Sequence, residues 1–390
     1  MLGPLQFLTQ IFWVQAHAPQ DIWLILVALI GASRGIGALT FGLYGGALAD
    51  RFDRRKLLIV TQLLLVVSTI AIAALMLSGI TGVIGFTVFF GLTFLSAGLQ
   101  AVDAPTRLAI VPDILGPSLT ASGMSMNQVA AQLAMPIAMF GAGFIIDALG
   151  FGLAYLFSVS GYVLAIGLLM FMRYAPATDH PSQPAQHYGL RDTLRDVRDG
   201  LSYARHHSVV LWIIVLLVTM MSLGFPSTAN LGPTWVTTVV GVEIRHMGYV
   251  AMTWGVGSLL AATGLMLYPN IKRRGLAIAV GALLYCGSFI FFVADATVVN
   301  AVIGNLGIGA GMTLAMVNST IAIQQLVPNA VRGRIMSIFQ LNMGFAQLMT
   351  LPIAVGAQWL SLQTLLPMIA YLTLAAVGLI LLTRRQIITA

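Results

Sequence analysis

The sequence predicts an all-α membrane protein whose chain consists of two repeated halves. Hydrophobic residues make up 58% of its 390 residues and charged residues only 8%, whereas soluble globular proteins carry roughly 25% charged residues. A water-soluble fold cannot cover its surface with so few charges, so lipid must serve as the solvent. The other two observations are a series of long apolar segments and a set of motifs that recurs at a constant interval.

Long apolar segments follow one another along almost the whole chain. A membrane-crossing helix needs about 20 mostly apolar residues. Segments of this kind cover roughly 22–49, 57–78, 81–104, 118–147, 150–172, 209–240, 247–268, 276–294, 298–325, 335–357 and 363–383. The apolar stretch 1–17 is shorter and would reach only about 25 Å as a helix. We expect it to form a twelfth, short helix placed first, or the end of a helix that begins upstream of Met1.

The stretch 173–208 interrupts this series near the middle of the chain. It divides the chain into an N-terminal bundle, 1–172, and a C-terminal bundle, 209–390. Apolar residues in the linker recur on one helical face, with charges on the other: Leu190, Leu194, Val197 and Leu201. This pattern predicts an amphipathic helix lying on the membrane surface, or else a solvated linker helix.

Basic residues gather in alternate loops, which predicts the orientation of the chain. Seventeen of the 19 basic residues lie on one side if residues 1–17 approach the membrane from that side. Cytoplasmic loops carry such an excess of Lys and Arg, so we expect the N terminus, the linker and the C terminus in the cytoplasm. Because the basic residues cluster in these loops, the net charge of +7 is explained by loops that face anionic lipid. We therefore expect no nucleic-acid partner.

Two corresponding segments indicate an internal duplication. Polar and proline positions match at offsets of 215 or 216: Ser122 with Ser337, Asn127 with Asn342, Gln132 with Gln347, and Pro136-Ile137-Ala138 with Pro352-Ile353-Ala354. Several matches in register are better explained by duplication than by chance. Parallel repeats related by an axis along the membrane normal are a known plan of transporters.

A loop between two apolar segments carries a family signature. Gly46-Ala47-Leu48-Ala49-Asp50-Arg51-Phe52-Asp53-Arg54-Arg55 resembles the signature Gly-x-x-x-Asp-Arg-x-Gly-Arg-Arg of the major facilitator superfamily, with Asp53 in place of the second glycine. The segments 103–112 and 331–337 are similar to the efflux subgroup that contains the bacterial enterobactin exporter. The fifth-helix antiporter signature of the family appears only in part, as Met135-Pro136-Ile137-Ala138-Met139-Phe140 followed by Gly141 and Gly143.

This resemblance implies a fold and a function. The fold would be two six-helix bundles related by pseudo-two-fold symmetry, with a short first helix. The function would be secondary active export of small amphipathic, drug-like or siderophore-like molecules across a bacterial inner membrane, coupled to protons. We expect a monomer with no cofactor. A nutrient importer of the same fold and a transport-inactive member of the family stay open.

The resemblance also implies a gate at the cytoplasmic side. Asp50 would face the positive N-terminal end of the eleventh helix. Arg51, Arg54 and Arg55 could pair with Asp103 and lock this side when the transporter faces outward. The alternative is that these basic residues only set the topology.

Polar residues inside the apolar segments are candidates for substrate binding, because polar groups are expensive in lipid. Arg34 lies near the middle of the second segment and could bind an anionic substrate group or a structural partner. The neutral candidates are Gln10, Asn127, Gln132, Asn230, Asn318, Asn342 and Gln347. For each of these, hydrogen bonding between helices is the alternative.

Glycine and proline predict local features of the helices. Gly224-Phe225-Pro226-Ser227 and Gly232-Pro233 should interrupt the hydrogen-bond ladder of the seventh helix and bend it, either as a static kink or as a hinge. Gly31-x-x-x-Gly35 and Gly307-x-x-x-Gly311 suit close packing of helix backbones.

Several classes of function are not supported by the sequence. Cys286 is the only cysteine, so neither a disulfide nor a multi-cysteine metal site can form. The chain has no phosphate-binding Gly-x-x-x-x-Gly-Lys-[Ser/Thr] loop. We find no cluster of His, Asp, Glu or Ser at one membrane face that would indicate an enzyme, and no metal is expected.

Overall fold

The structure of the chain is a computed structural model. It describes residues 2–172, 198, 202–203, 205–268, 271 and 273–389. The side chains of 43–51, and of some residues within 113–132 and 329–341, are outside this description. The predicted amphipathic helix of the linker lies almost entirely outside the described residues.

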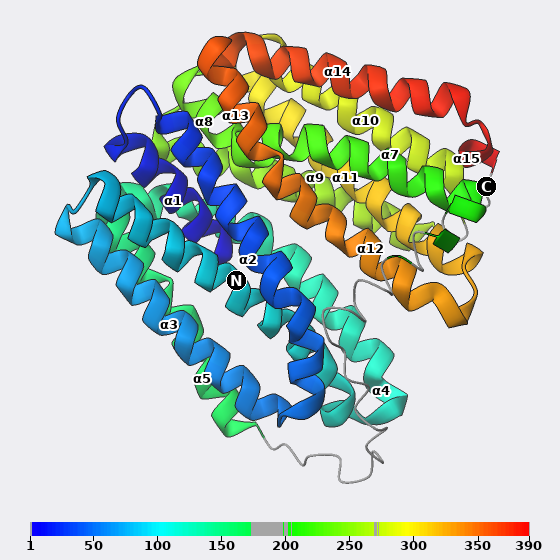
Figure 1. Cartoon of the computed structure of the whole chain (residues 1–390), viewed down its shortest axis with the longest axis horizontal. Helices are drawn as coiled ribbons and strands as arrows, with labels where there is room; N and C mark the ends of the chain where they lie inside the picture. Colours follow the sequence, from blue (N-terminus) through cyan, green and yellow to red (C-terminus); the bar gives the residue numbers. More distant parts are fainter. Residues whose placement is uncertain are drawn as a thin grey trace.

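Helices account for nearly all of the described chain (Figure 1). The helices before the linker are α1 (Gly3–His17), α2 (Trp23–Arg51), α3 (Arg54–Ser78), α4 (Gly82–Phe157) and α5 (Val159–Phe171). After the linker come α7 (Ser208–Phe225), η1 (Pro226–Asn230), α8 (Gly232–Thr238), α9 (Ile244–Leu267), α10 (Arg274–Ala294), α11 (Val298–Leu326), α12 (Asn329–Leu348), α13 (Thr350–Trp359), α14 (Leu362–Thr383) and α15 (Gln386–Thr389). Among the described residues, nine helices are long and apolar enough to cross a membrane.

Two glycines divide the long helix α4 into three membrane-crossing parts. Gly116 has φ 71° and ψ 170°, and Gly150 has φ 73° and ψ 171°. These conformations are accessible to glycine at little cost and strained for other residues, so the chain can reverse direction at each of them. The three parts correspond to the predicted segments 81–104, 118–147 and 150–172, the last of which continues into α5.

The short first helix is part of the core. α1 has 15 residues, and it packs against α2, α4 and α8. Its Leu5, Ile11 and Trp13 are buried. The chain has six crossing segments on either side of the linker. Before the linker these are α1, α2, α3 and the three parts of α4, the last of which continues into α5. After it they are the broken helix α7–η1–α8, then α9, α10 and α11, the broken helix α12–α13, and α14. The predicted all-helical membrane fold is confirmed.

The departure from the loop signature at Asp53 has a local explanation. Asp53 is the N-cap of α3, and its Oδ1 accepts a hydrogen bond from the backbone N–H of Lys56 at 2.9 Å. An N-cap aspartate satisfies one of the unpaired N–H groups at the start of a helix and favours its positive end. The substitution for glycine therefore fixes the start of α3 rather than loosening the loop.

The two halves meet at the side of the molecule away from the linker. On that side Gln15 of α1 hydrogen-bonds with Thr237 of α8 at 3.4 Å, and Gln358 donates to the carbonyl oxygen of Asp21 at 3.2 Å. Figure 1 shows α2 close to α13 near α8, whereas α2 and α12 diverge toward the side where α5 ends. We call these the opposite side and the linker side.

Small residues let the halves approach closely. A Cβ on Gly143 of α4 would lie 2.7 Å from the carbonyl oxygen of Ile244, and one on Gly248 of α9 would collide with that of Phe140. Gly31 and Gly35 of α2 lie equally close to α12 and α13, and a Cβ on Gly35 would be 2.9 Å from Cβ of Gln347. The expectation that Gly31-x-x-x-Gly35 packs helix backbones closely is confirmed, as it is for Gly307-x-x-x-Gly311, which packs against α10.

We predict that Gly248→Leu separates the two halves at the opposite side. Its side chain would overlap the backbone of α4, and overpacking of this kind destabilises proteins by about 1–3 kcal/mol. The thermal midpoint of the purified protein should fall by several degrees. Gly264→Leu on the same helix is the matched control, because a Cβ there meets nothing within 4 Å. Equal midpoints for the two variants would contradict the close contact.

Candidate functional site

A cavity of about 360 Å³ lies between the two halves. A volume of this size is typical of sites that bind small molecules. Helices of both halves contribute to its wall, namely α1, α2 and α4 from the first half and α7 through α12 from the second. No acidic side chain lines it among the described residues. The cavity therefore presents one kind of charge only, the guanidinium of Arg34.

One wall of the cavity is formed by an interruption of the seventh crossing segment. The segment Pro226–Asn230 is a π-helical turn, in which the backbone N–H of Leu231 donates to the carbonyl oxygen of Pro226 at 3.0 Å. Pro226 has no N–H to continue the α-helical ladder, and π-turns occur frequently at functional sites. The predicted interruption of the hydrogen-bond ladder is confirmed, and Thr228 and Asn230 of this turn line the cavity.

A second interruption faces the first. α12 ends at Leu348 and α13 begins at Thr350. Pro352 lies in the first turn of α13, so the carbonyl oxygen of Leu348 lacks the N–H that an unbroken helix would provide. The two interruptions are joined by a side chain, because Asn230 Nδ2 donates to Gln347 Oε1 at 2.9 Å and to Thr350 Oγ1 at 2.6 Å.

Helix α2 of the first half packs directly on this amide cluster. A Cβ on Gly31 would lie 2.8 Å from Asn230 Nδ2 and 3.1 Å from Gln347 Oε1. Only glycine allows α2 to come so close. The carbonyl oxygen Oδ1 of Asn230 is buried and has no hydrogen-bond partner in the described part of the chain, so the cluster retains one free acceptor.

Arg34 supplies the charge of the cavity. It follows Gly31 by three residues on α2 and lines the cavity. Its guanidinium carbon lies 5.1 Å from the centre of the Phe7 ring, a cation–π contact. Within the described ranges its guanidinium has no hydrogen bond or ion pair. An unpaired cation in a largely apolar cavity is a candidate site for binding an anionic group.

The rest of the wall is apolar and adaptable. Five methionines and three aromatic residues surround the polar groups: Met135, Met139, Met247, Met312, Met343, Phe225, Trp254 and Phe292. Methionine side chains are flexible and polarizable and fit ligands of different shape. Asn305 also lines the cavity, but its amide is held by the carbonyl oxygen of Val250 at 2.8 Å.

Other predicted binding residues lie away from the cavity. Gln10 is buried inside the first half and donates to Tyr155 Oη at 3.0 Å and to Thr93 Oγ1 at 3.3 Å. Asn318 donates to the carbonyl oxygen of Leu314 in its own helix. Asn342 is buried but does not line the cavity.

Of the N-terminal copies of the repeated candidate binding residues, only Asn127 can be placed, and it does not line the cavity. Asn127 is exposed, and the side chain of Gln132 is outside the description. Of the predicted residues, the structure thus brings together Arg34, Asn230 and Gln347. The sequence analysis did not identify Phe7 or Thr350. Thr350 could have been found, because it is a polar residue two positions before Pro352, where the helix is expected to break.

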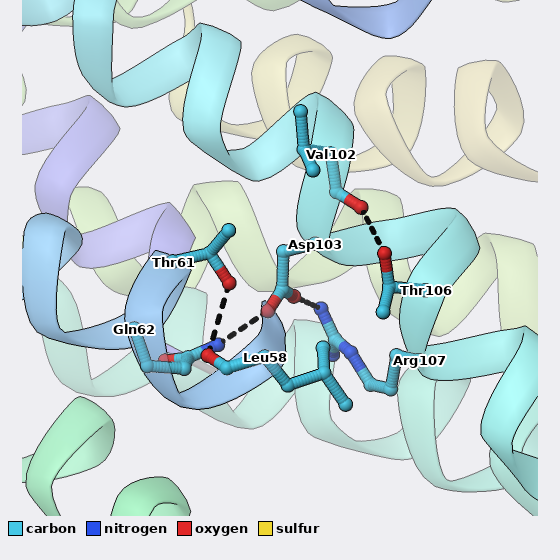
Figure 2. Close-up of polar contacts among 7 residues, drawn as sticks. All are labelled: Leu58, Thr61, Gln62, Val102, Asp103, Thr106 and Arg107. Atoms are coloured by element: carbon cyan, nitrogen blue, oxygen red, sulfur yellow. Dashed lines mark hydrogen bonds and ion pairs between the residues drawn. The ribbon is translucent and has the colours of Figure 1, made fainter. Parts of the chain in front are cut away.

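Among the proposed gate residues, Asp103 has described partners other than the arginines of the loop signature. Asp103 is 3% exposed and forms an ion pair with Arg107, whose side chain is 59% exposed. Figure 2 shows Gln62 of α3 approaching Asp103 from the other side, and its Nε2 donates to Asp103 Oδ1 at 2.7 Å. In this conformation Asp103 therefore ties α4 to α3 within the first half.

Two arginines of the loop signature, Arg54 and Arg55, donate hydrogen bonds to backbone carbonyl groups. Arg54 donates to the carbonyl oxygen of Ala109 at 2.9 Å. Arg55 donates to those of Leu169 at 2.9 Å and Met170 at 2.7 Å, which lie at the C-terminal end of α5. A cation there satisfies unpaired carbonyl groups and favours the negative end of the helix. The side chains of Asp50 and Arg51 lie outside the described set, and exchange of Asp103 between arginines stays a prediction.

These features define a class of protein. A helical membrane protein with two similar halves, a cavity between them and broken helices at that cavity has the architecture of a secondary transporter. The model of the Major Facilitator Superfamily matches residues 15–351 of this chain. The chain belongs to this superfamily.

Known proteins support the assignment at the level of fold and family. The staphyloferrin A transporter of Staphylococcus aureus is 23% identical over 340 residues, which cover 85% of this chain and 81% of that protein. The crystal structure of a variant of the nucleoside transporter NupG matches with a TM-score of 0.75 at 11% identity and covers 99% of this chain and 98% of that chain. The D-xylose–proton symporter matches with a TM-score of 0.70 at 15% identity, with coverage of 97% and 95%.

We predict that Asp103→Leu destabilises the first half, whereas Asp103→Asn leaves it nearly intact. Leucine would leave the buried amide of Gln62 without its acceptor, at a cost of about 2 kcal/mol. Asparagine keeps an oxygen for Gln62, and the exposed Arg107 can be hydrated. Thermal unfolding of the purified variants measures the difference. Similar losses for both variants would mean that the charge, rather than the hydrogen bond to Gln62, stabilises the fold.

Proposed function

We propose that this protein exports small amphipathic molecules of the siderophore or drug-like kind by alternating access. The observation that carries the proposal is the cavity between the halves, where the unpaired Arg34 lies beside the Asn230–Gln347 cluster at two broken helices. Such a cavity combines one charged contact with an apolar, methionine-rich wall. It suits a molecule that has a polar anionic end and a hydrophobic body.

The relatives support this class of substrate. The similar protein from Staphylococcus aureus is named as a transporter of staphyloferrin A. The segments 103–112 and 331–337 of this chain resemble efflux proteins that include the enterobactin exporter. We carry over the chemical class of the substrate from both comparisons and the direction of transport from the resemblance to efflux proteins. The identity of the compound is not carried over.

The transport cycle would move the N-terminal bundle 1–172 against the C-terminal bundle 209–390, with the linker 173–208 between them. The contacts between the halves at the opposite side, including Gln15 with Thr237, favour a state open toward the linker side. With the N terminus, the linker and the C terminus in the cytoplasm of a bacterial cell and the chain in its inner membrane, this state loads substrate from inside. We propose that a single chain completes the cycle and that protons drive it.

Import is the second candidate function. The solved structures that match the fold include a D-xylose–proton symporter, so the fold itself does not fix the direction of transport. The two functions differ in a measurable way, because an exporter lowers the cellular level of its substrate and an importer raises it. An inactive protein would leave the cellular level of the substrate unchanged.

We predict that cells lacking their own efflux systems accumulate less of an anionic amphipathic compound when they express this protein. Arg34→Gln should abolish the effect, because it removes the only charge among the described residues that line the cavity, and Arg34→Lys should retain part of it. Asn318→Leu is the control, since Asn318 is buried outside the cavity. Increased accumulation would favour import, and no change with any variant at equal expression would contradict transport of such compounds.

We predict that a reducible bifunctional thiol reagent that links Gln15→Cys to Thr237→Cys stops transport reversibly. The link would hold α1 against α8 and keep the opposite side closed, while a reductant that cleaves the reagent would restore activity. The native Cys286 is buried and can be replaced by serine to remove background. Full transport by the cross-linked protein would show that these helices do not separate during the cycle.

A further inference from the structure

Two groups in the cavity lack a partner in the described chain, and they differ in chemistry. Arg34 is a cation that needs an anion. Asn230 Oδ1 is a neutral acceptor on a side chain that is 2% exposed, and it needs a donor. Leaving a buried acceptor unpaired costs about 1–3 kcal/mol. A molecule that satisfies both groups at once would therefore bind more tightly than one that satisfies either alone.

Helix α2 places the two groups next to one another. Gly31 touches the amide of Asn230, and Gly35 touches the side chain of Gln347. Arg34 lies between these glycines in the sequence, one helical turn from Gly31, and residues three apart lie on the same helix face. Both residues line one cavity, and Arg34 lies one helical turn from the glycine that packs against the Asn230 amide.

We propose that the transported molecule is a hydroxycarboxylate. Its carboxylate would bind the guanidinium of Arg34 and its hydroxyl would donate to Asn230 Oδ1, while its apolar body would lie against the methionines and Trp254. A hydroxyl fits better than an ammonium as the donor, because a second cation beside Arg34 would be repelled. The inference rests on the proposed function in that it names the substrate class of the same cavity, but binding can be measured without transport.

Four small probes separate the two contacts on the full-length protein. Mandelate carries the carboxylate and the hydroxyl; phenylacetate lacks the hydroxyl; O-methylmandelate replaces the donor by an ether; and methyl mandelate lacks the charge. Titration calorimetry on the protein in lipid nanodiscs gives the dissociation constant of each. We expect mandelate to bind about tenfold more tightly than phenylacetate and O-methylmandelate, the effect of one buried hydrogen bond. Methyl mandelate should bind at least tenfold more weakly than mandelate.

Variants assign each contact to its residue. In Asn230→Leu the preference for mandelate over phenylacetate should disappear, while both still bind better than methyl mandelate. In Arg34→Gln the affinity for mandelate should fall to the affinity for methyl mandelate. Asn318→Leu is the matched control, because Asn318 also has a buried Oδ1 without a described partner but does not line the cavity; it should keep the wild-type order.

Equal affinity of the wild type for mandelate and phenylacetate would overturn the proposal, and so would the absence of binding by all four probes. An equal loss of affinity for mandelate and phenylacetate in Asn230→Leu would overturn the role of Asn230. These results come from the unmodified protein as well as the variants, so a variant that fails to fold does not prevent a decision. The expected binding pattern without a change in cellular accumulation would leave the substrate class standing and refute export.

Discussion

Lipid offers no hydrogen bonds to a protein backbone, so every crossing segment must satisfy its own polar groups. Breaks in a crossing helix are tolerated only where protein or a water-filled cavity covers them. In this chain the π-turn Pro226–Asn230 and the break between α12 and α13 are placed opposite one another. Asn230 bridges them through Gln347 and Thr350. The cavity thus lies at the place where irregular backbone is tolerated in a membrane protein.

The same constraint explains why α2 carries glycine at its contact with these breaks. A side chain at Gly31 would displace the amide of Asn230, and one at Gly35 would displace Gln347. Close contact with α2 in turn brings Arg34 to the cavity, where lipid cannot reach it. The partial desolvation of the guanidinium strengthens its attraction to an anion, while the ring of Phe7 offers only a weaker cation–π contact.

The fold could be predicted from the sequence because its signals are local. Apolar length predicts crossings, Pro226 predicts the interruption and Gly31-x-x-x-Gly35 predicts a close contact. The partners of buried polar residues could not be predicted in this way. Gln10 and Asn230 look alike in the sequence, yet the first binds Tyr155 inside one half and the second faces the cavity. The difference depends on the rotation of each helix, which packing decides.

The matching sequence positions of the two halves do not have equivalent places in the structure. Gln347 lies at the cavity and its neighbour Asn342 is buried, whereas Asn127, the repeat mate of Asn342, is exposed. Among the described residues that line the cavity, the second half supplies the neutral hydrogen-bonding groups and the first half supplies the charge, from Arg34. A ligand that uses both contacts joins the two halves. In the proposed alternating-access cycle the halves move relative to one another, so the binding energy of such a ligand would depend on their relative position. This dependence would couple occupancy of the cavity to the change of state.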